Sequence, residues 1–318
     1  MNVTEVLPRD AIPSIDDPAF ADSYEGSGDD KVVVLDGAVP RAYPIRILSY
    51  HEIVNDAVER NGIETPVAVT WCPLCGSAVV YDRRVCDRVL SFGVSGLLAD
   101  DDLVMYDRET ESHWKQSTGR CFDGELAGTS LEVRPAAMTT WRAFREANPE
   151  GVVLQPTDME SEAASDDDSP APIDYSVDPY EAYFSGEGFG LAAHRDSDDA
   201  RDWSREDVDP KEPVLGIERG DEAVGYPRCR VEAAGGLVRD TVGGDRIVVV
   251  AGDGELHAFA HPGFPVELED GSIVGDGTRW HPTSGESDDG RRLDRLPARR
   301  VFAFTWQDDH GADAFYEP

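Results

Sequence analysis

Two cysteines lie close together in the segment Trp71-Cys72-Pro73-Leu74-Cys75-Gly76. Their spacing lets both sulfurs point at one centre, which suits a zinc or other transition-metal ion, or thiol redox chemistry. A thioredoxin-like site would place the first cysteine at the start of a helix, whereas the residues that follow, 77–82, form a strand-like run. The sequence therefore favours the Cys-Pro-x-Cys-Gly turn of a zinc knuckle over a thioredoxin-like site.

A tetrahedral zinc site needs more than two ligands, and no second Cys-x-x-Cys pair is present. Four residues could complete the site, namely His51, His113, Cys86 and Cys121. None of them stands at a diagnostic spacing from Cys72 and Cys75. We predict a metal site formed by Cys72, Cys75 and His51. If no metal binds, His51 could act as base to a Cys72 or Cys75 thiolate.

In that nucleophile interpretation, Glu52 or Asp56 would orient the imidazole of His51. Two further interpretations remain open. The cysteines could be small buried side chains at a tight turn, and His51 could be a helix-end histidine whose nitrogens bond the backbone. The sequence does not decide whether the protein is an enzyme.

Two similar triplets, Tyr81-Asp82-Arg83 and Tyr106-Asp107-Arg108, end two of the expected strands. Such triplets are typical of turns, where aspartate bonds nearby amides and arginine pairs across a hairpin. Alternatively, the planar guanidinium groups of Arg83 and Arg108 could hold the carboxylate or phosphate of a small-molecule ligand. In that case the protein would be a non-enzymatic binding module with packed cysteines.

The elements that position these residues are short runs of Val, Ile and aromatic residues, broken by Gly, Pro, Asp and Asn. The pattern predicts an α+β, β-rich fold of mostly antiparallel strands with short helices. Helices are expected at 44–52, after Pro44, and at 140–147, capped by Thr139 or Thr140. The expected strands are 31–36, 65–71, 77–82, 88–94, 102–107 and 151–155.

The two halves of the chain resemble each other in the order of their segments. Val32-Val33-Val34-Leu35, Tyr43-Pro44 and Val67-Ala68-Val69 in the first half match Val214-Leu215-Gly216-Ile217, Tyr226-Pro227 and Val248-Val249-Val250 in the second. The order predicts two diverged copies of one unit, at 1–155 and 173–318, joined by an acidic, serine-rich linker or insertion at 156–172. The second copy has neither the cysteine loop nor His51-Glu52, which suggests that these residues act together.

The first half resembles the family called domain of unknown function 3179. The resemblance lies in the segments 67–78, 92–97 and 102–110, together with Trp114 and Tyr50-His51-Glu52-Ile53-Val54, and extends more faintly through 173–318. It implies a fold and a site around the cysteine loop, without an activity or a substrate.

The charge of the chain narrows the classes of partner. Acidic residues number 64 against 29 basic ones, which gives a formal net charge of -35. Such a surface repels phosphate, so we expect no nucleic-acid and no membrane partner. The few lysines are Lys31, Lys115 and Lys211, and this composition predicts a halophilic protein adapted to molar salt. With no recognisable leader or membrane segment, we expect a cytoplasmic location.

Overall fold

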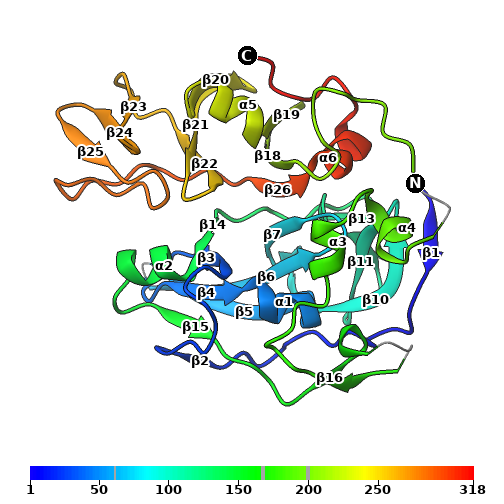
Figure 1. The fold of residues 1–318 in the computed structure, drawn as a ribbon. Helices are drawn as coiled ribbons and strands as arrows, with labels where there is room; N and C mark the ends of the chain where they lie inside the picture. Colours follow the sequence, from blue (N-terminus) through cyan, green and yellow to red (C-terminus); the bar gives the residue numbers. More distant parts are fainter. Residues whose placement is uncertain (61, 166–168, 198–200) are drawn as a thin grey trace.

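The structure is a computed structural model, and it describes residues 1–60, 62–165, 169–197 and 201–318. Its strands are mostly antiparallel, and its described helices are at most eight residues long (Figure 1). The predicted β-rich class with short helices is therefore confirmed. None of the described helices has the length and apolar character needed to cross a membrane.

Three sheets make up most of the fold. The first has the order β14-β3-β4-β15-β2 and consists of Ala137–Thr140, Lys31–Leu35, Arg41–Pro44, Val152–Leu154 and Phe20–Ala21. The second has the order β1-β10-β11-β12-β13 and consists of Val3–Glu5, Phe92–Ala99, Asp102–Asp107, His113–Lys115 and Arg120–Asp123. The third has the order β19-β18-β26-β7-β6-β5 and consists of Glu222–Pro227, Pro213–Arg219, Arg299–Phe302, Ser77–Asp82, Ile63–Cys72 and Ile53–Arg60.

The remaining strands form smaller sheets. They are β8 and β9 (Arg84–Val85, Arg88–Val89), β16 and β17 (Glu160–Ser161, Ala171–Pro172), β20 to β22 (Leu237–Val242, Asp245–Gly252, Glu255–Ala260) and β23 to β25 (Glu267–Glu269, Ser272–Gly275, Thr278–Trp280). The helices α1 to α6 are Ile45–His51, Trp141–Ala147, Glu181–Ser185, Gly190–His194, Arg228–Ala233 and Ala303–His310, and a 3-10 turn covers Glu162–Ala164. Thr140 caps α2 by accepting a hydrogen bond from the Ala143 amide, as predicted.

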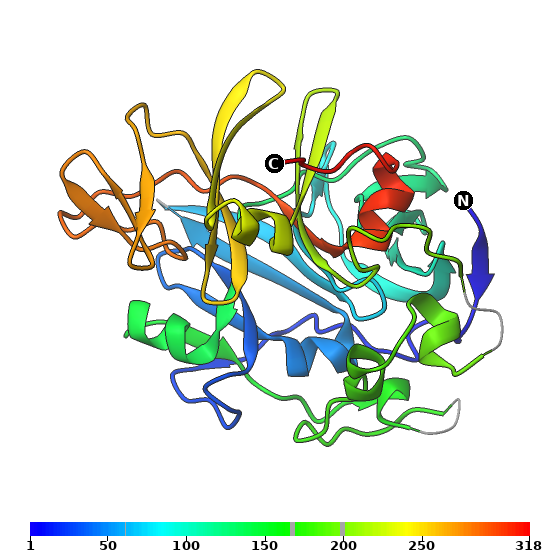
Figure 2. The same cartoon turned by 45° about the horizontal axis from the view of Figure 1, so that its top comes forward.

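The third sheet runs through both halves of the chain. In it, β26 from the C-terminal half pairs with β7 through Arg300 and Ala78, and this joins a hairpin of one half to the cysteine hairpin of the other. Figures 1 and 2 show the C-terminal half lying along one side of the N-terminal half, with β26 at the boundary. The core below the cysteine loop accordingly combines Cys72 and Cys75 with Phe302 and Phe304.

The order of elements recurs along the chain. The sequence β3-β4-α1-β5-β6-β7, followed later by β14-α2, is matched by β18-β19-α5-β20-β21-β22 and then β26-α6. The sheet neighbours recur as well, because β3 lies between β14 and β4 just as β18 lies between β26 and β19. The recurrence agrees with a duplication, which stays a prediction.

Residues on both sides of the expected boundary at 172 pack against the N-terminal half. Ser161, in β16, is fully buried, and its hydroxyl donates to the carbonyl of Tyr50. Tyr180, Tyr183 and Phe189 belong to the core that contains the cysteines. Helices α3 and α4 thus pack on the core that contains the cysteines, and the predicted unit boundary stays a prediction.

Candidate functional site

The cysteine loop is the turn of a β-hairpin. Cys72 ends β6 and pairs with Ser77 at the start of β7, and the Gly76 amide donates to the Pro73 carbonyl over 3.2 Å. Gly76 has a φ of +53°, and a Cβ atom at this position would lie 2.6 Å from the Phe302 ring. The strand β7 follows the loop, so the loop does not lead into a helix as in a thioredoxin-like site, as the sequence predicted.

Asp102 joins the two cysteines in a compact cluster. One ligand atom from each of Cys72, Cys75 and Asp102 lies within 4.8 Å of the others. Asp102 begins β11, just after the turn at Asp100 and Asp101, so it comes from a different hairpin. All three side chains are at most 1 % exposed. The fold therefore brings two sulfurs and a carboxylate together out of contact with solvent.

The carboxylate of Asp102 is only partly satisfied. Its Oδ2 accepts a hydrogen bond from the Ser117 amide over 2.9 Å, while Oδ1 is buried and has no partner among the described residues. Burial raises the pKa of Asp102 to about 6. An unpaired buried carboxylate oxygen is costly in the absence of a bonding partner, and this carboxylate lies within ligand spacing of two sulfurs, which together point to a bound ligand.

The two thiols differ from activated cysteines. Burial raises the pKa of Cys72 and raises that of Cys75 well above its usual value. Cys75 Sγ also donates to the Asp101 carbonyl over 3.3 Å. Both side chains are therefore protonated near neutral pH unless a cation replaces the protons. This argues against the predicted thiolate nucleophile, because the thiolate is the reactive form.

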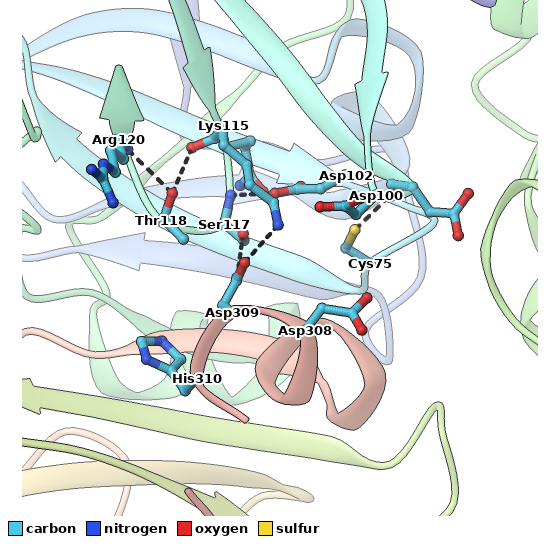
Figure 3. Close-up of polar contacts among 12 residues, drawn as sticks. Cys75, Asp100, Asp102, Lys115, Ser117, Thr118, Arg120, Asp308, Asp309 and His310 are labelled. Atoms are coloured by element: carbon cyan, nitrogen blue, oxygen red, sulfur yellow. Dashed lines mark hydrogen bonds and ion pairs between the residues drawn. The ribbon is translucent and has the colours of Figure 1, made fainter. Parts of the chain in front are cut away.

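A buried ion pair lies beside the cluster. Lys115 Nζ is 2.6 Å from Asp309 Oδ1, and the Ser117 hydroxyl donates to Asp309 Oδ2 over 2.6 Å (Figure 3). Although burial disfavours the charged amine, the nearby carboxylates of Asp309 and Asp102 raise the pKa of Lys115. Lys115 is therefore a fixed positive charge next to Asp102.

Residues of the C-terminal half cover the cysteine loop and bond its backbone. The Phe302 amide donates to the Cys75 carbonyl over 2.8 Å, and Arg300 Nη1 donates to the Gly76 carbonyl over 2.9 Å. Asp309 comes from α6, which directly follows β26. The site is thus completed by residues more than 200 positions after Cys75 in the chain.

A small cavity of about 130 Å³ reaches the cluster at Cys72. Glu52 and Tyr180 also line it. Glu52 has a φ of +57°, which is rare for a residue other than glycine and is found mostly where surrounding structure enforces it. Burial, with smaller contributions from the Glu162 and Asp102 charges, raises the pKa of Glu52 to about 8.

His51 and Asp56 bond to other partners. The His51 ring nitrogens lie 2.8 Å from the Pro13 carbonyl and 2.6 Å from the Tyr175 hydroxyl, and burial lowers the pKa of His51. His51 is absent from the cluster that shares ligand spacing. Asp56 instead accepts from Arg41 over 2.6 Å and from the Tyr43 hydroxyl over 2.5 Å. These bonds lend no support to the predicted action of His51 and Asp56 on a thiol, which stays a prediction.

Arg83 and Arg108 both bond groups of the protein itself. Arg83 donates to the carbonyls of Leu90 and Asp56 over 2.7 and 3.1 Å, and burial lowers the pKa of Arg83. Arg108 bonds Asp16 and donates to Ser14 Oγ over 2.9 Å. Neither residue belongs to the cysteine cluster, so their predicted ligand-binding role gains no support from these contacts.

The other cysteines and the histidine considered as metal ligands lie outside the cluster of Cys72, Cys75 and Asp102. Cys86 is exposed, while Cys121 is buried and bonds the Asp123 carbonyl over 3.3 Å. His113 lies 3.2 Å from an Asp123 carboxylate oxygen. Within the described ranges, none of these three shares ligand spacing with Cys72.

Sequence reasoning missed Asp102, Lys115 and Asp309. Two of them carried a usable signal, since an aspartate that starts an apolar strand is unusual, and Lys115 is among very few lysines in the chain. Both also lie in or next to segments that carry the family resemblance. Asp309 carried none, because it lies on a short polar stretch far along the chain.

Comparison with known proteins places the chain in a family without assigning an activity. No curated protein and no solved structure matches it. A family model described as "Protein of unknown function (DUF3179)" matches residues 9–313, which is nearly the whole chain and includes both halves. The protein therefore belongs to the DUF3179 family, as the resemblance in the cysteine loop and its neighbouring segments indicated.

Proposed function

We propose that the protein binds a transition-metal ion, with zinc the best match, through Cys72, Cys75 and Asp102. The observation that carries the proposal is the unpaired Asp102 Oδ1 in a buried cluster with two sulfurs. Ligand atoms of a tetrahedral zinc site lie about 3.3–3.8 Å apart when the bonds to zinc are about 2.0–2.3 Å long. The spacing of the cluster, within 4.8 Å, is compatible with such a site after small side-chain adjustments.

The electrostatic environment also supports metal binding. A divalent cation would replace the protons of the two thiols, whose pKa values are raised by burial in the metal-free protein. Two thiolates and one carboxylate around Zn²⁺ leave one net negative charge, which is the charge that an ionised Asp102 already carries between two neutral thiols next to the Lys115–Asp309 pair. This charge balance reduces the cost of burying the ion.

Three protein ligands leave one coordination position for water or a small ligand. The cavity of about 130 Å³ that reaches Cys72 provides room on that side of the cluster. Catalytic zinc sites have this arrangement of three protein ligands and one open position, whereas structural sites are closed by four. We therefore propose an open metal centre, with Glu52 at the wall of the cavity.

Thiol redox chemistry is the second candidate. The Cys72 and Cys75 thiols are close enough to hydrogen-bond with each other, which is the proximity that a disulfide requires. Burial of both thiols and their raised pKa values weigh against rapid exchange. The non-enzymatic binding module with packed cysteines remains the third.

We also propose that 1–155 and 173–318 are diverged copies of one unit, connected by 156–172. The recurring element order and the equivalent sheet positions of β3 and β18 support the proposal. In this arrangement the second copy has no cysteine loop of its own and instead covers that of the first through β26 and α6.

Metal content measured by mass spectrometry tests the metal proposal. Protein freed of metal by chelation and then supplied with Zn²⁺ should retain one ion per chain. Asp102→Asn should weaken zinc binding by at least about tenfold, and Cys72→Ala/Cys75→Ala should abolish it. Cys121→Ala, which alters a buried thiol outside the cluster, is the matched control and should bind normally.

Two measurements on the wild-type protein guard against variants that fail to fold. Co²⁺ should produce thiolate-to-metal charge-transfer absorption. Zn²⁺ should slow the labelling of two thiols in the folded protein, where a thiol reagent reaches them only by transient opening. Wild-type protein that retains neither ion contradicts the metal proposal. If instead the two thiols interconvert reversibly with a disulfide at a cellular reduction potential, the redox candidate is correct.

A further inference from the structure

A second cavity lies on the opposite side of the cysteine hairpin. Trp71 and Cys72 are consecutive in β6, so their side chains point to opposite faces of the sheet. Cys72 belongs to the core with Trp114, whereas Trp71 belongs to the core with Tyr43. The cavity on the Trp71 side has a volume of about 580 Å³, within the range typical of small-molecule sites.

Aromatic and aliphatic side chains form the inner wall of this cavity. Trp71 and Phe184 have ring centroids 6.4 Å apart, as do Phe184 and Phe302. Ile45 and Met138 also line the cavity. The wall therefore offers a set of adjacent ring faces and edges suited to a planar, apolar group.

The indole nitrogen of Trp71 has no hydrogen-bond partner among the described residues. Trp71 is only 4 % exposed, and it lines the cavity. A buried indole N–H is a donor only, and it normally finds an acceptor. A ligand acceptor that reaches this nitrogen from the cavity, after a small movement of the side chains that cover it, would satisfy it.

Basic side chains gather on another part of the wall. Lys31 and Arg300 line the cavity, and both bind the same buried carboxylate, Glu255, over 2.9 Å. Two cations that share one carboxylate leave a local excess of one positive charge, in a chain whose net charge is -35. The acidic residues Glu25 and Asp178 also line the cavity but are exposed, so solvent screens their charges more than that of Arg300, whose side chain is 18 % exposed.

Arg46 contributes a weaker cation. It lines the same cavity and lies 3.5 Å from Asp30, and it also bonds the Tyr175 carbonyl. Asp30 in turn accepts from the Tyr24 hydroxyl over 2.5 Å. The charge of Arg46 is therefore largely balanced by that of Asp30. Lys31 and Arg300 remain the cations that could attract an anion.

We propose that this cavity binds a small planar carboxylate that also carries a hydrogen-bond acceptor. The planar body lies against Trp71, Phe184 and Phe302, the carboxylate meets the charge excess of Lys31 and Arg300, and the acceptor bonds the Trp71 indole N–H. This site is separate from the proposed metal centre and does not depend on it. Because Trp71 directly precedes Cys72, the two sites share one strand.

Titration with 4-hydroxybenzoate, followed by calorimetry and tryptophan fluorescence, tests the proposal. The wild-type protein should bind one molecule per chain, and the neutral analogue 4-hydroxybenzamide should bind at least about tenfold more weakly because it cannot use the charge excess. Trp71→Phe should weaken binding of the carboxylate by about tenfold, and Lys31→Met by a similar factor. Trp141→Phe, on α2 and outside the cavity wall, should bind as the wild type does.

Ile45→Trp gives an independent test if Trp71→Phe unfolds the protein. Ile45 is partly exposed at the cavity, so a larger side chain there fills space at little cost to the core and should abolish binding. The proposal is overturned if wild-type protein shows no saturable binding of 4-hydroxybenzoate. Equal affinity for the amide, or full binding by Ile45→Trp, would equally overturn it.

Discussion

Lys115 Nζ and Asp309 Oδ1 lie 2.6 Å apart although 194 positions separate the two residues in the chain. Each side chain is less than 10 % exposed, so the pair forms a buried electrostatic link between β12 and α6. The carboxylate of Asp102 is also close enough to Lys115 to raise the pKa of its amine. The C-terminal half therefore covers the cysteine loop and also supplies a buried carboxylate, that of Asp309, next to it.

Removing one partner of this pair should destabilise the protein strongly. Asp309→Asn leaves the Lys115 charge buried without its closest counter-charge, and we expect a loss of about 3–5 kcal/mol in the free energy of unfolding. Asp289→Asn is the control, because Asp289 pairs with Arg291 at an exposed site and should change stability by less than about 1 kcal/mol. Urea unfolding of both variants measures the difference. A loss for Asp309→Asn no larger than for Asp289→Asn would show that solvent reaches the pair.

Gly76→Ala should destabilise the cysteine loop. The alanine would have to adopt a φ of +53°, and its Cβ would lie 2.6 Å from the Phe302 ring. We expect a loss of about 2–4 kcal/mol, of which about 1–2 kcal/mol comes from the backbone conformation alone. Gly271→Ala is the matched control, because Gly271 has a φ of +75° and nothing lies within 4 Å of its Cβ position. Equal losses in thermal melts of the two variants would show that Phe302 moves aside freely.

Glu52 should make the metal-free protein less stable as the pH rises. Burial raises its pKa from 4.5 to about 8 in the folded state, so the folded protein keeps a proton that the unfolded chain releases. This contribution is fully present below about pH 4.5 and is lost as the pH rises through 8. The wild-type stability should therefore fall by a few kcal/mol relative to Glu52→Gln between these values.

Chemical denaturation of both proteins at several pH values measures that difference. The exposed Glu64→Gln provides the control and should follow the wild type at every pH. If the wild type and Glu52→Gln keep a constant difference from pH 4.5 to 8, Glu52 is not the buried acid described above.

The acidic surface should make folding depend on salt. With a net charge of -35, the native state should lose helix and sheet signal in circular dichroism as NaCl falls from molar concentration to ~0.1 M. The Debye length grows from about 3 to about 10 Å over this range, so repulsion between surface carboxylates is screened less. Sucrose, which does not screen charge, should not replace the salt at low ionic strength. Melting curves that coincide at both salt concentrations would refute the predicted salt adaptation.

Short stretches of sequence determined the local structure around the cysteines. The strand-like run at 77–82, the Pro and Gly of the loop, and the cap at Thr140 predicted β7, the knuckle turn and α2. These features depend on backbone preferences and contacts within a few residues, so they can be read from neighbouring positions. The cysteines were identified for the same reason, since both sulfurs of one turn necessarily lie near each other.

Only the tertiary structure decided which residues surround the sulfurs. Asp102 reaches them because the β10–β11 hairpin packs against the cysteine hairpin. Asp309 reaches Lys115, beside this cluster, because α6 follows β26 and β26 pairs with β7. His51, although close to Asp56 in the chain and adjacent to Glu52, turns to Pro13 and Tyr175 instead. Hydrophobic patterning shows which face of a strand is buried but not which distant strand covers it, because that choice depends on the packing of the whole core.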